Sequence, residues 1–200
     1  KYAISEYRQY NQEGNIKTVL KETTTKLDSA VKNDSSDRTD SEKLYDASRD
    51  MISTRLEGAN SIGASNKDKA FAAGVFAGQY GRHVVFIYNY CKTLGVDVSD
   101  FSNGYKKIHK DLYKRADAIL KRDGSNIEKT YKAAEQLVMP YIKKEVVDIR
   151  TMFIKETGDK RFTLVDSCNY YNQIAHDPEL FKSINFSTIA PKPFNILMNN

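Results

Sequence analysis

The stretch GRHVVFIYNYCKTLGVDVSDF, residues 81–101, decides the fold, because its apolar part VVFIYNYC suits either a buried strand or a buried helix. The residues before it favour the helix. Gly74, Gly78 and Gly81 recur at steps of four and three, which aligns small residues along one strip of a helix. The same density of glycine would be costly in a strand. The pattern therefore predicts a helix that another helix can approach closely.

This helix is expected to run from about residue 67 to 94, with Asn66 or Asp68 as a cap at its start. Apolar residues occur on nearly every side of it between positions 84 and 94, which is typical of a helix at the centre of a bundle. Gly95 follows as a stop, because glycine accepts the left-handed conformation that ends helices.

Helical spacing of apolar residues covers most of the remaining chain, and we find no convincing strand and no internal repeat. Ser99 or Asp100 is expected to cap one further helix, and Ser125 with Glu128 has the spacing of a capping box. Pro140 should kink or divide the helix that contains it. The further helices are expected at residues 4–31 in two pieces, at 41–56, 99–122, 126–157, 159–175 and 178–184.

The sequence thus predicts an all-α fold, with residues 1–200 forming a single helical bundle of six or seven helices. Residues 33–40 and 57–66 are polar and are expected to be loops. Residues 185–200 contain two prolines between apolar anchors, so this tail is expected to pack on the bundle, extended or as one helical turn.

The net charge of +5 is spread among acidic residues along most of the chain, which is typical of a solvated helical surface. No apolar run is long enough to span a membrane. One cluster is more basic than the rest, and a solvated face is a better interpretation of it than a nucleic-acid or anionic-lipid surface, since no nucleic-acid-binding motif accompanies it. The cluster contains Lys106, Lys107, Lys110, Lys114, Arg115, Lys121 and Arg122.

The two cysteines, Cys91 and Cys168, each lie on the apolar face of a predicted helix. Their spacing fits no metal motif of the CxxC kind. The residues alone leave two possibilities: one structural disulfide in an oxidising compartment, or two buried thiols. The chain begins at Lys1 and not at Met, so we expect that an upstream segment was removed, by a signal peptidase or by the choice of the expressed segment.

Arg82 lies where the strip of small residues meets the apolar run, so its charge must be paired or must reach solvent. An ion pair with an acidic residue of a neighbouring helix would satisfy it. The alternative is a ligand-binding site, in which Arg82 anchors an anion or small ligand in a groove along Gly74, Gly78 and Gly81. No Gly-Lys-Ser or Gly-Lys-Thr follows these glycines, which argues against a phosphate loop.

The histidines His83, His109 and His176 are isolated from one another in sequence, and none forms a metal-binding pair at helical spacing. We therefore expect no metal site, no cofactor and no catalytic residue that the sequence identifies. A hydrolytic enzyme whose site is assembled in three dimensions, around His109 or His176, remains an alternative.

Two segments carry a resemblance: YCKTLGVD at residues 90–97 within 70–101, and a second Cys followed by an apolar-aromatic segment and Pro within 168–197. They resemble small exported all-helical proteins of Gram-negative bacteria, which are largely uncharacterised, over roughly a third of the chain. The resemblance implies export to the periplasm or secretion, and a Cys91–Cys168 disulfide. Some small helical periplasmic proteins of similar build are immunity proteins that block a secreted toxin.

The leading functional hypothesis is a non-catalytic exported protein that binds a protein partner, as an immunity or envelope accessory factor. The many tyrosines support it, since exposed Tyr is enriched at interfaces. We expect no nucleic-acid partner and no membrane span. The alternatives are the ligand binder with Arg82 at its site and the hydrolytic enzyme described above.

Overall fold

The computed structural model describes residues 21–199, apart from the side chain of residue 137, and these residues form helices joined by loops, with no strand among them. The predicted all-α class is confirmed. The predicted helical residues before position 21 lie outside the described residues.

Residues 21–33 are helical. The further helices are α2 (Asp40–Arg55), α3 (Asn66–Gly81), the π-helical turn η1 (Arg82–Phe86), α4 (Ile87–Thr93), α5 (Ser99–Ile108), α6 (Lys110–Arg122), α7 (Ile127–Thr157), α8 (Leu164–His176), α9 (Pro178–Ser183), α10 (Phe186–Ile189) and α11 (Pro191–Met198).

The described residues divide into more helices than the six or seven predicted. The helix expected at 67–94 is continuous in backbone but contains η1, and the helix expected at 99–122 is interrupted at His109. The tail is also more helical than expected, because it forms α10 and α11 in place of an extended segment or a single turn. In α11, Ile196 and Leu197 are completely buried in the core, so this helix is an integral part of the packing.

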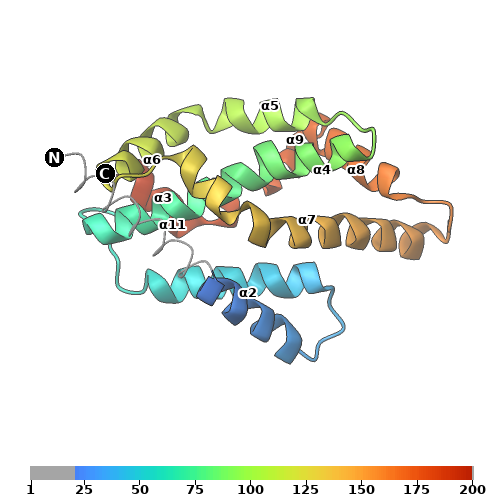
Figure 1. Ribbon diagram of the computed structural model, residues 1–200, viewed down its shortest axis with the longest axis horizontal. Helices are drawn as coiled ribbons and strands as arrows, with labels where there is room; N and C mark the ends of the chain where they lie inside the picture. Colours follow the sequence, from blue (N-terminus) through green and yellow to red (C-terminus); the bar gives the residue numbers. More distant parts are fainter. Residues whose placement is uncertain (1–20, 200) are drawn as a thin grey trace, which may run out of the picture.

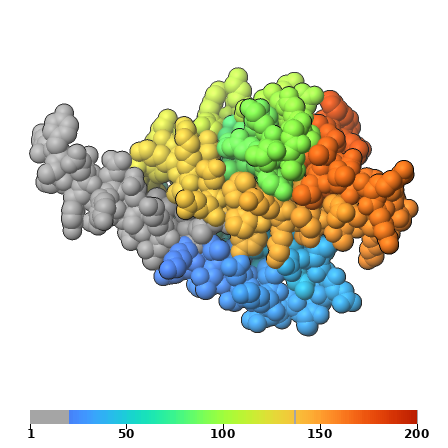
Figure 2. Space-filling view, turned by 45° about the vertical axis from the view of Figure 1, so that its right-hand side comes forward, coloured from blue at the N-terminus to red at the C-terminus, as the bar shows by residue number. Residues whose placement is uncertain are grey.

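The long helix α7 lies between two groups of helices (Figure 1). On one side are α3, α4, α5 and α6, and on the other side are α2 and the helical residues 21–33. Figure 2 shows residues 21–56, in blue, lying along one edge next to α7, in orange. No helix within residues 21–199 combines the length and the apolar character needed to cross a bilayer.

The chain α3–η1–α4 is the central helix of the bundle, as the sequence predicted. The VVFIYNYC segment is helical throughout, and α3 packs against α6, α7 and α11. Ala72, Ala73 and Phe76 are fully buried. Gly95 has φ of +79°, so it ends the helix in the left-handed conformation expected of it.

Cys91 and Cys168 form a disulfide that joins α4 to α8. Both residues are fully buried, in a core cluster that also contains Phe86, Phe101 and Val146. The structure therefore contains the bridge that the resemblance implied, and the alternative of two buried thiols does not apply.

Several helices begin at a different cap from the one predicted. Thr39 caps α2 with a Thr39–Glu42 capping box, two residues before the expected start at Ser41. The start of α3 is capped by the Ser65 side chain, which accepts a hydrogen bond from the Asp68 N–H, and not by Asn66 or Asp68. Each true cap is a Ser or Thr with extended backbone one residue before the first helical residue, which is the geometry that frees its oxygen to accept.

The predicted caps of α5 and α7 are also wrong. Val98 precedes α5 and makes no side-chain cap, and the Ser99 N–H is instead bonded by the side chain of Asp97. Asn126 caps α7 by accepting from the Lys129 N–H, so the Ser125–Glu128 box does not form.

The C-terminal half of the chain bears on three further predictions. Of the two outcomes predicted for Pro140, a kink or a division, the division does not occur, since α7 is one helix from Ile127 to Thr157 with Pro140 inside it. The helix ends at Gly158, with φ of +72°, as expected. The next helix begins at Leu164 and not near 159, because a Thr163–Asp166 capping box defines its start. Asp177 caps α9 with Pro178 in its first turn, as predicted.

The predicted strip of small residues has two different environments. A Cβ placed on Gly81 would lie 2.4 Å from the Cβ of Tyr131 in α7, whereas no described atom lies within 4 Å of a Cβ placed on Gly74 or Gly78. Close helix approach therefore depends on Gly81 alone. Gly104 in α5 makes a similar approach, because its Cβ would lie 2.8 Å from the Phe181 ring.

We predict that replacing both cysteines by alanine lowers the free energy of unfolding by about 4 kcal/mol, since the bridge closes a long loop in the unfolded chain. The disulfide spans 77 residues. Urea unfolding of C91A/C168A measures the loss, and the wild-type protein under reducing conditions should show a similar one. An unchanged midpoint in both would contradict the prediction.

We predict that Gly81→Ala and Gly78→Ala have opposite effects on stability. Gly81→Ala should cost about 1–3 kcal/mol, because the new methyl group overlaps Tyr131. Gly78→Ala should stabilise by up to about 1 kcal/mol, because alanine favours the helix and the added methyl group meets no described atom. Thermal unfolding of the two variants compares them directly, and equal shifts would contradict the proposed contact.

Candidate functional site

Arg82 forms an ion pair with Glu145 of α7, with a distance of 2.6 Å between Nη2 and Oε2. The second carboxylate oxygen accepts a hydrogen bond from the Tyr171 hydroxyl of α8 at 3.0 Å. Burial, followed by the charge of Glu145, raises the pKa of Tyr171 well above its usual range, so the phenol keeps its proton. The arrangement matches the ion-pair interpretation of Arg82.

The three glycines of the predicted groove, Gly74, Gly78 and Gly81, do not share one surface in the structure. Gly81 is buried against Tyr131, while Gly74 and Gly78 are half-exposed. The Arg82 side chain is 31% exposed, although its charged end is held by Glu145. A ligand at this place would have to share Arg82 with Glu145.

His83 is buried beside this ion pair and is held as a neutral ring. Its Nδ1 donates to the Gln79 carbonyl at 2.8 Å, and its Nε2 accepts from Arg82 Nη1 at 2.9 Å. Burial, and then the charge of Arg82, lowers the pKa of His83 well below its usual range. The ring stacks on Tyr105, with 4.4 Å between ring centroids.

His109 lies on the other side of Tyr105, at 4.1 Å between ring centroids. Its Nδ1 donates to the Tyr105 carbonyl, and its Nε2 accepts from the N–H of Phe186 in the tail at 3.1 Å. Burial lowers the pKa of His109. Both ring nitrogens therefore bond to the main chain, and His109 ties the junction of α5 and α6 to the tail.

The interior next to these rings contains polar atoms without a described partner. They are Gln79 Oε1, Ser102 Oγ and Tyr105 Oη, all buried within the described residues. No group of three or more His, Cys, Asp or Glu side chains in residues 21–199 is arranged to hold a metal ion.

A polar cavity of about 310 Å³ lies between the helical residues 21–33, the start of α2 and α7. Its groups already bond to one another: Tyr141 donates to Asp28, Lys144 pairs with Asp40, and Lys43 donates to the Asp34 carbonyl. Burial, and then the Asp28 carboxylate, raises the pKa of Tyr141 to about 12. A ligand in this cavity would have to displace these bonds, so it is a weak candidate for a binding site.

A second cleft, also of about 310 Å³, lies where α5 meets the end of α8 and the helix α9. Its lining is mostly apolar and none of the described residues in it is acidic. His176, at its edge, is 3.5 Å from the Asp100 carboxylate, and both side chains are well exposed. The lining residues are Ile108, Ala175, His176, Pro178, Phe181, Lys182 and Asn185.

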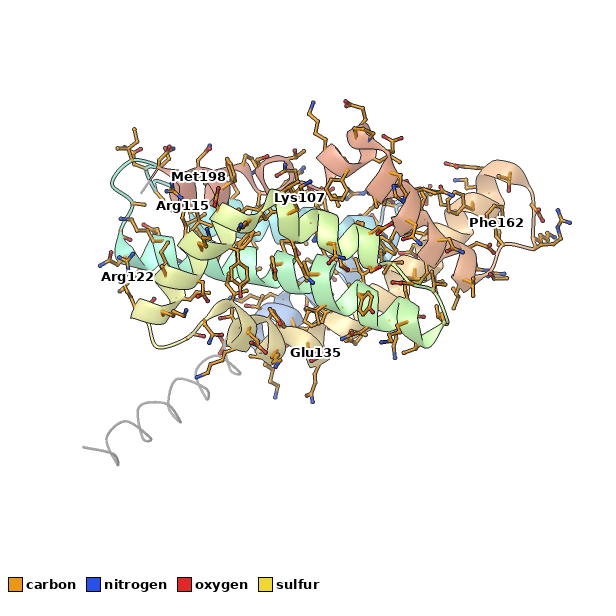
Figure 3. All side chains as sticks on the ribbon, turned by 90° about the horizontal axis from the view of Figure 1, so that it is seen from above. Lys107, Arg115, Arg122, Glu135, Phe162 and Met198 are labelled. Atoms are coloured by element: carbon orange, nitrogen blue, oxygen red, sulfur yellow. A yellow bond between two sulfur atoms is a disulfide. The ribbon has the colours of Figure 1, made fainter. Side chains whose placement is uncertain are left out.

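The outer surface of α5 and α6 borders this cleft and carries most of the net charge. These two helices contain seven Lys or Arg against three Asp, a net charge of +4, while the whole chain has +5. Figure 3 shows Lys107, Arg115 and Arg122 spaced along them. Lys121 pairs with Asp117, whereas Lys106, Lys107, Lys110 and Arg122 make no ion pair with a described residue. We call this surface the basic face.

The cations of the basic face are evident in the sequence, but the cleft beside it is not. The residues of the cleft come from two segments of the chain that are far apart, at Ile108 and at 175–185. No local signal marked the cleft, because Ile108 belongs to the apolar series of its helix and was expected to be buried, whereas the structure shows it 46% exposed.

Comparison with protein-family models, with curated proteins and with solved structures finds no match for this chain. The resemblance to small exported helical proteins therefore stays a prediction. Function must be inferred from the arrangement of residues alone.

We predict that the protein loses stability as the pH falls below about 6.5, because the unfolded chain then binds protons that buried His83 and His109 do not accept. The folded pKa of each histidine lies below its unfolded value, so the stabilisation is complete above pH 6.5 or so and is lost towards acid. Each histidine contributes a slope of up to about 1.4 kcal/mol per pH unit.

The measurement is the free energy of unfolding in urea across this pH range. His109→Gln should reduce the slope whatever its effect on stability at neutral pH. A wild-type stability that is constant between about pH 5 and 7 would contradict the prediction.

Proposed function

We propose that this chain is an exported protein that acts by binding a protein partner through the basic face of α5 and α6, as an immunity or envelope accessory factor. The observation that carries the proposal is the concentration of unpaired cations on these two helices. Charge of one sign on a rigid surface favours a partner of the opposite sign, both by steering association and by excluding wrong partners.

The basic face is presented by a rigid part of the molecule. Phe101, Tyr105, Leu112, Ala116 and Leu120, on the inner sides of α5 and α6, are all buried in the core. The outer cations therefore have fixed backbone positions, which limits the entropy lost when a partner binds.

Export to the periplasm or secretion is part of the proposal and is supported by the Cys91–Cys168 disulfide, since such bonds persist in oxidising compartments. The partner in this view is an acidic protein of the same compartment.

A small-ligand site at Arg82 is the second candidate. It is supported by the exposure of the Arg82 side chain and by the open space at Gly74 and Gly78. Its weakness is that Glu145 and His83 already occupy the guanidinium.

The test is capture of partners from an envelope extract of the source organism on immobilised protein. The wild-type protein should retain a stoichiometric partner, and the variant K106E/K107E/K110E should lose it. The matched control K129E/K143E/K155E makes the same change of charge on exposed positions of α7 and should retain the partner.

The proposal fails if the wild-type protein retains no stoichiometric partner, or if both triple variants retain it equally. Circular dichroism of the two variants should match the wild-type spectrum, since all six lysines are exposed.

A further inference from the structure

Residues 21–51, which we call the strap, form helices that lie along α7 on the opposite side from α5 and α6 (Figure 1). No described side chain of the strap is buried, and none belongs to either of the two core clusters. The last turn of α2 is different, because Ile52 packs on the core and Leu56 is fully buried. The strap is therefore joined to a buried anchor but lies outside the core itself.

The contact between the strap and α7 contains polar bonds and polar space. The polar cavity of about 310 Å³ lies within it, and the described lining of this cavity is polar or charged apart from Val31. A contact with few buried apolar groups belongs to the part of a structure that opens most easily. Hydroxyl and ammonium groups bond to carboxylates across the contact, Tyr141 with Asp28, Lys144 with Asp40, and Ser41 with Asp148.

Other bonds join the two helices of the strap to each other. Arg38, in the loop between them, pairs with Asp34 at 2.7 Å and also with Asp46 of α2. Lys43 of α2 donates to the Asp34 carbonyl at 2.8 Å. These bonds connect the end of the first helix to the beginning of the second. We therefore expect the two helices to leave α7 together and not one at a time.

We infer that the strap is released from α7 as a unit while the other helices stay folded, and that it thereby controls access to the side of α7 that carries Tyr141, Lys144 and Asp148. The other helices stay folded because the Cys91–Cys168 disulfide and both core clusters lie outside the strap. The inference is independent of the proposed function, which concerns α5 and α6.

Release has a measurable consequence for the backbone of the strap. Isolated helices shorter than about 12–15 residues are marginal in water, and the helices of the strap are of about this length. Once released from α7, they lose most of their helical hydrogen bonds. Their backbone N–H groups then exchange hydrogen with the solvent.

The test is native-state hydrogen exchange of the full-length chain, measured by mass spectrometry of peptides from the strap, from α3 and from α8. In the wild-type protein, both helices of the strap should share one opening constant, at least about tenfold larger than that of α3 and α8. The variant Y141F/K144M removes two bonds to the strap. It should raise the opening constant of the strap about tenfold and leave that of α3 and α8 unchanged.

The variant Y131F/K132M is the matched control. It makes the same two substitutions in α7 outside the contact, because Tyr131 packs on Gly81 and Lys132 pairs with Glu128. It should leave the exchange of the strap unchanged.

Several results would overturn the inference. Exchange of the strap as slow as that of α3 would show a single cooperative unit, and different opening constants for its two helices would show that they do not move together. A strap without any protection would not be docked on α7. An equal effect of Y141F/K144M on the strap and on α8, or an equal effect of the control variant, would also contradict it. The proposed function fails separately, through the charge-reversal variants of the basic face.

Discussion

The helix formed by α3, η1 and α4 packs against α5, α6, α7 and α11, and the burial of its inner side is the constraint on which the remaining structure depends. A polar side chain on that inner side needs a partner inside the protein. Arg82 therefore requires Glu145 from α7, and His83 requires the Gln79 carbonyl and Arg82 itself. The polar groups of the core are thus consequences of where this helix lies.

Bonds made by this helix also connect parts of the chain that are far apart in sequence. Glu145 is shared with Tyr171 of α8, while the disulfide joins α4 to α8 at Cys91 and Cys168. The rings of His83, Tyr105 and His109 continue the contact towards the tail, where His109 accepts the Phe186 N–H. Helices α3 to α8 and the tail are therefore held by directional bonds as well as by apolar packing, which favours one arrangement over others.

The charged groups on the surface of α5 and α6 differ from Arg82 and the buried histidines, which are bonded to groups inside the protein. Cations on α5 and α6 are exposed and mostly unpaired, and the apolar cleft beside them is open to solvent. Groups that are satisfied inside the protein are poor candidates for recognition, whereas unpaired charges and exposed apolar surface gain free energy when a partner covers them. This contrast is the reason for placing the proposed interface on the basic face and not at the buried histidines.

The sequence by itself determined the helical class, the central position of residues 67–94 and the stops at Gly95 and Gly158, because these depend on local periodicity and on backbone conformation. It did not determine η1, whose extra residue shifts the faces of all later positions in that helix, nor the interruption at His109, which accompanies a bond to the tail at Phe186. The partner of Arg82 and the cleft at Ile108 likewise come from residues far away in the chain. Only the tertiary structure decided these, because each depends on a contact between segments that the order of residues does not place side by side.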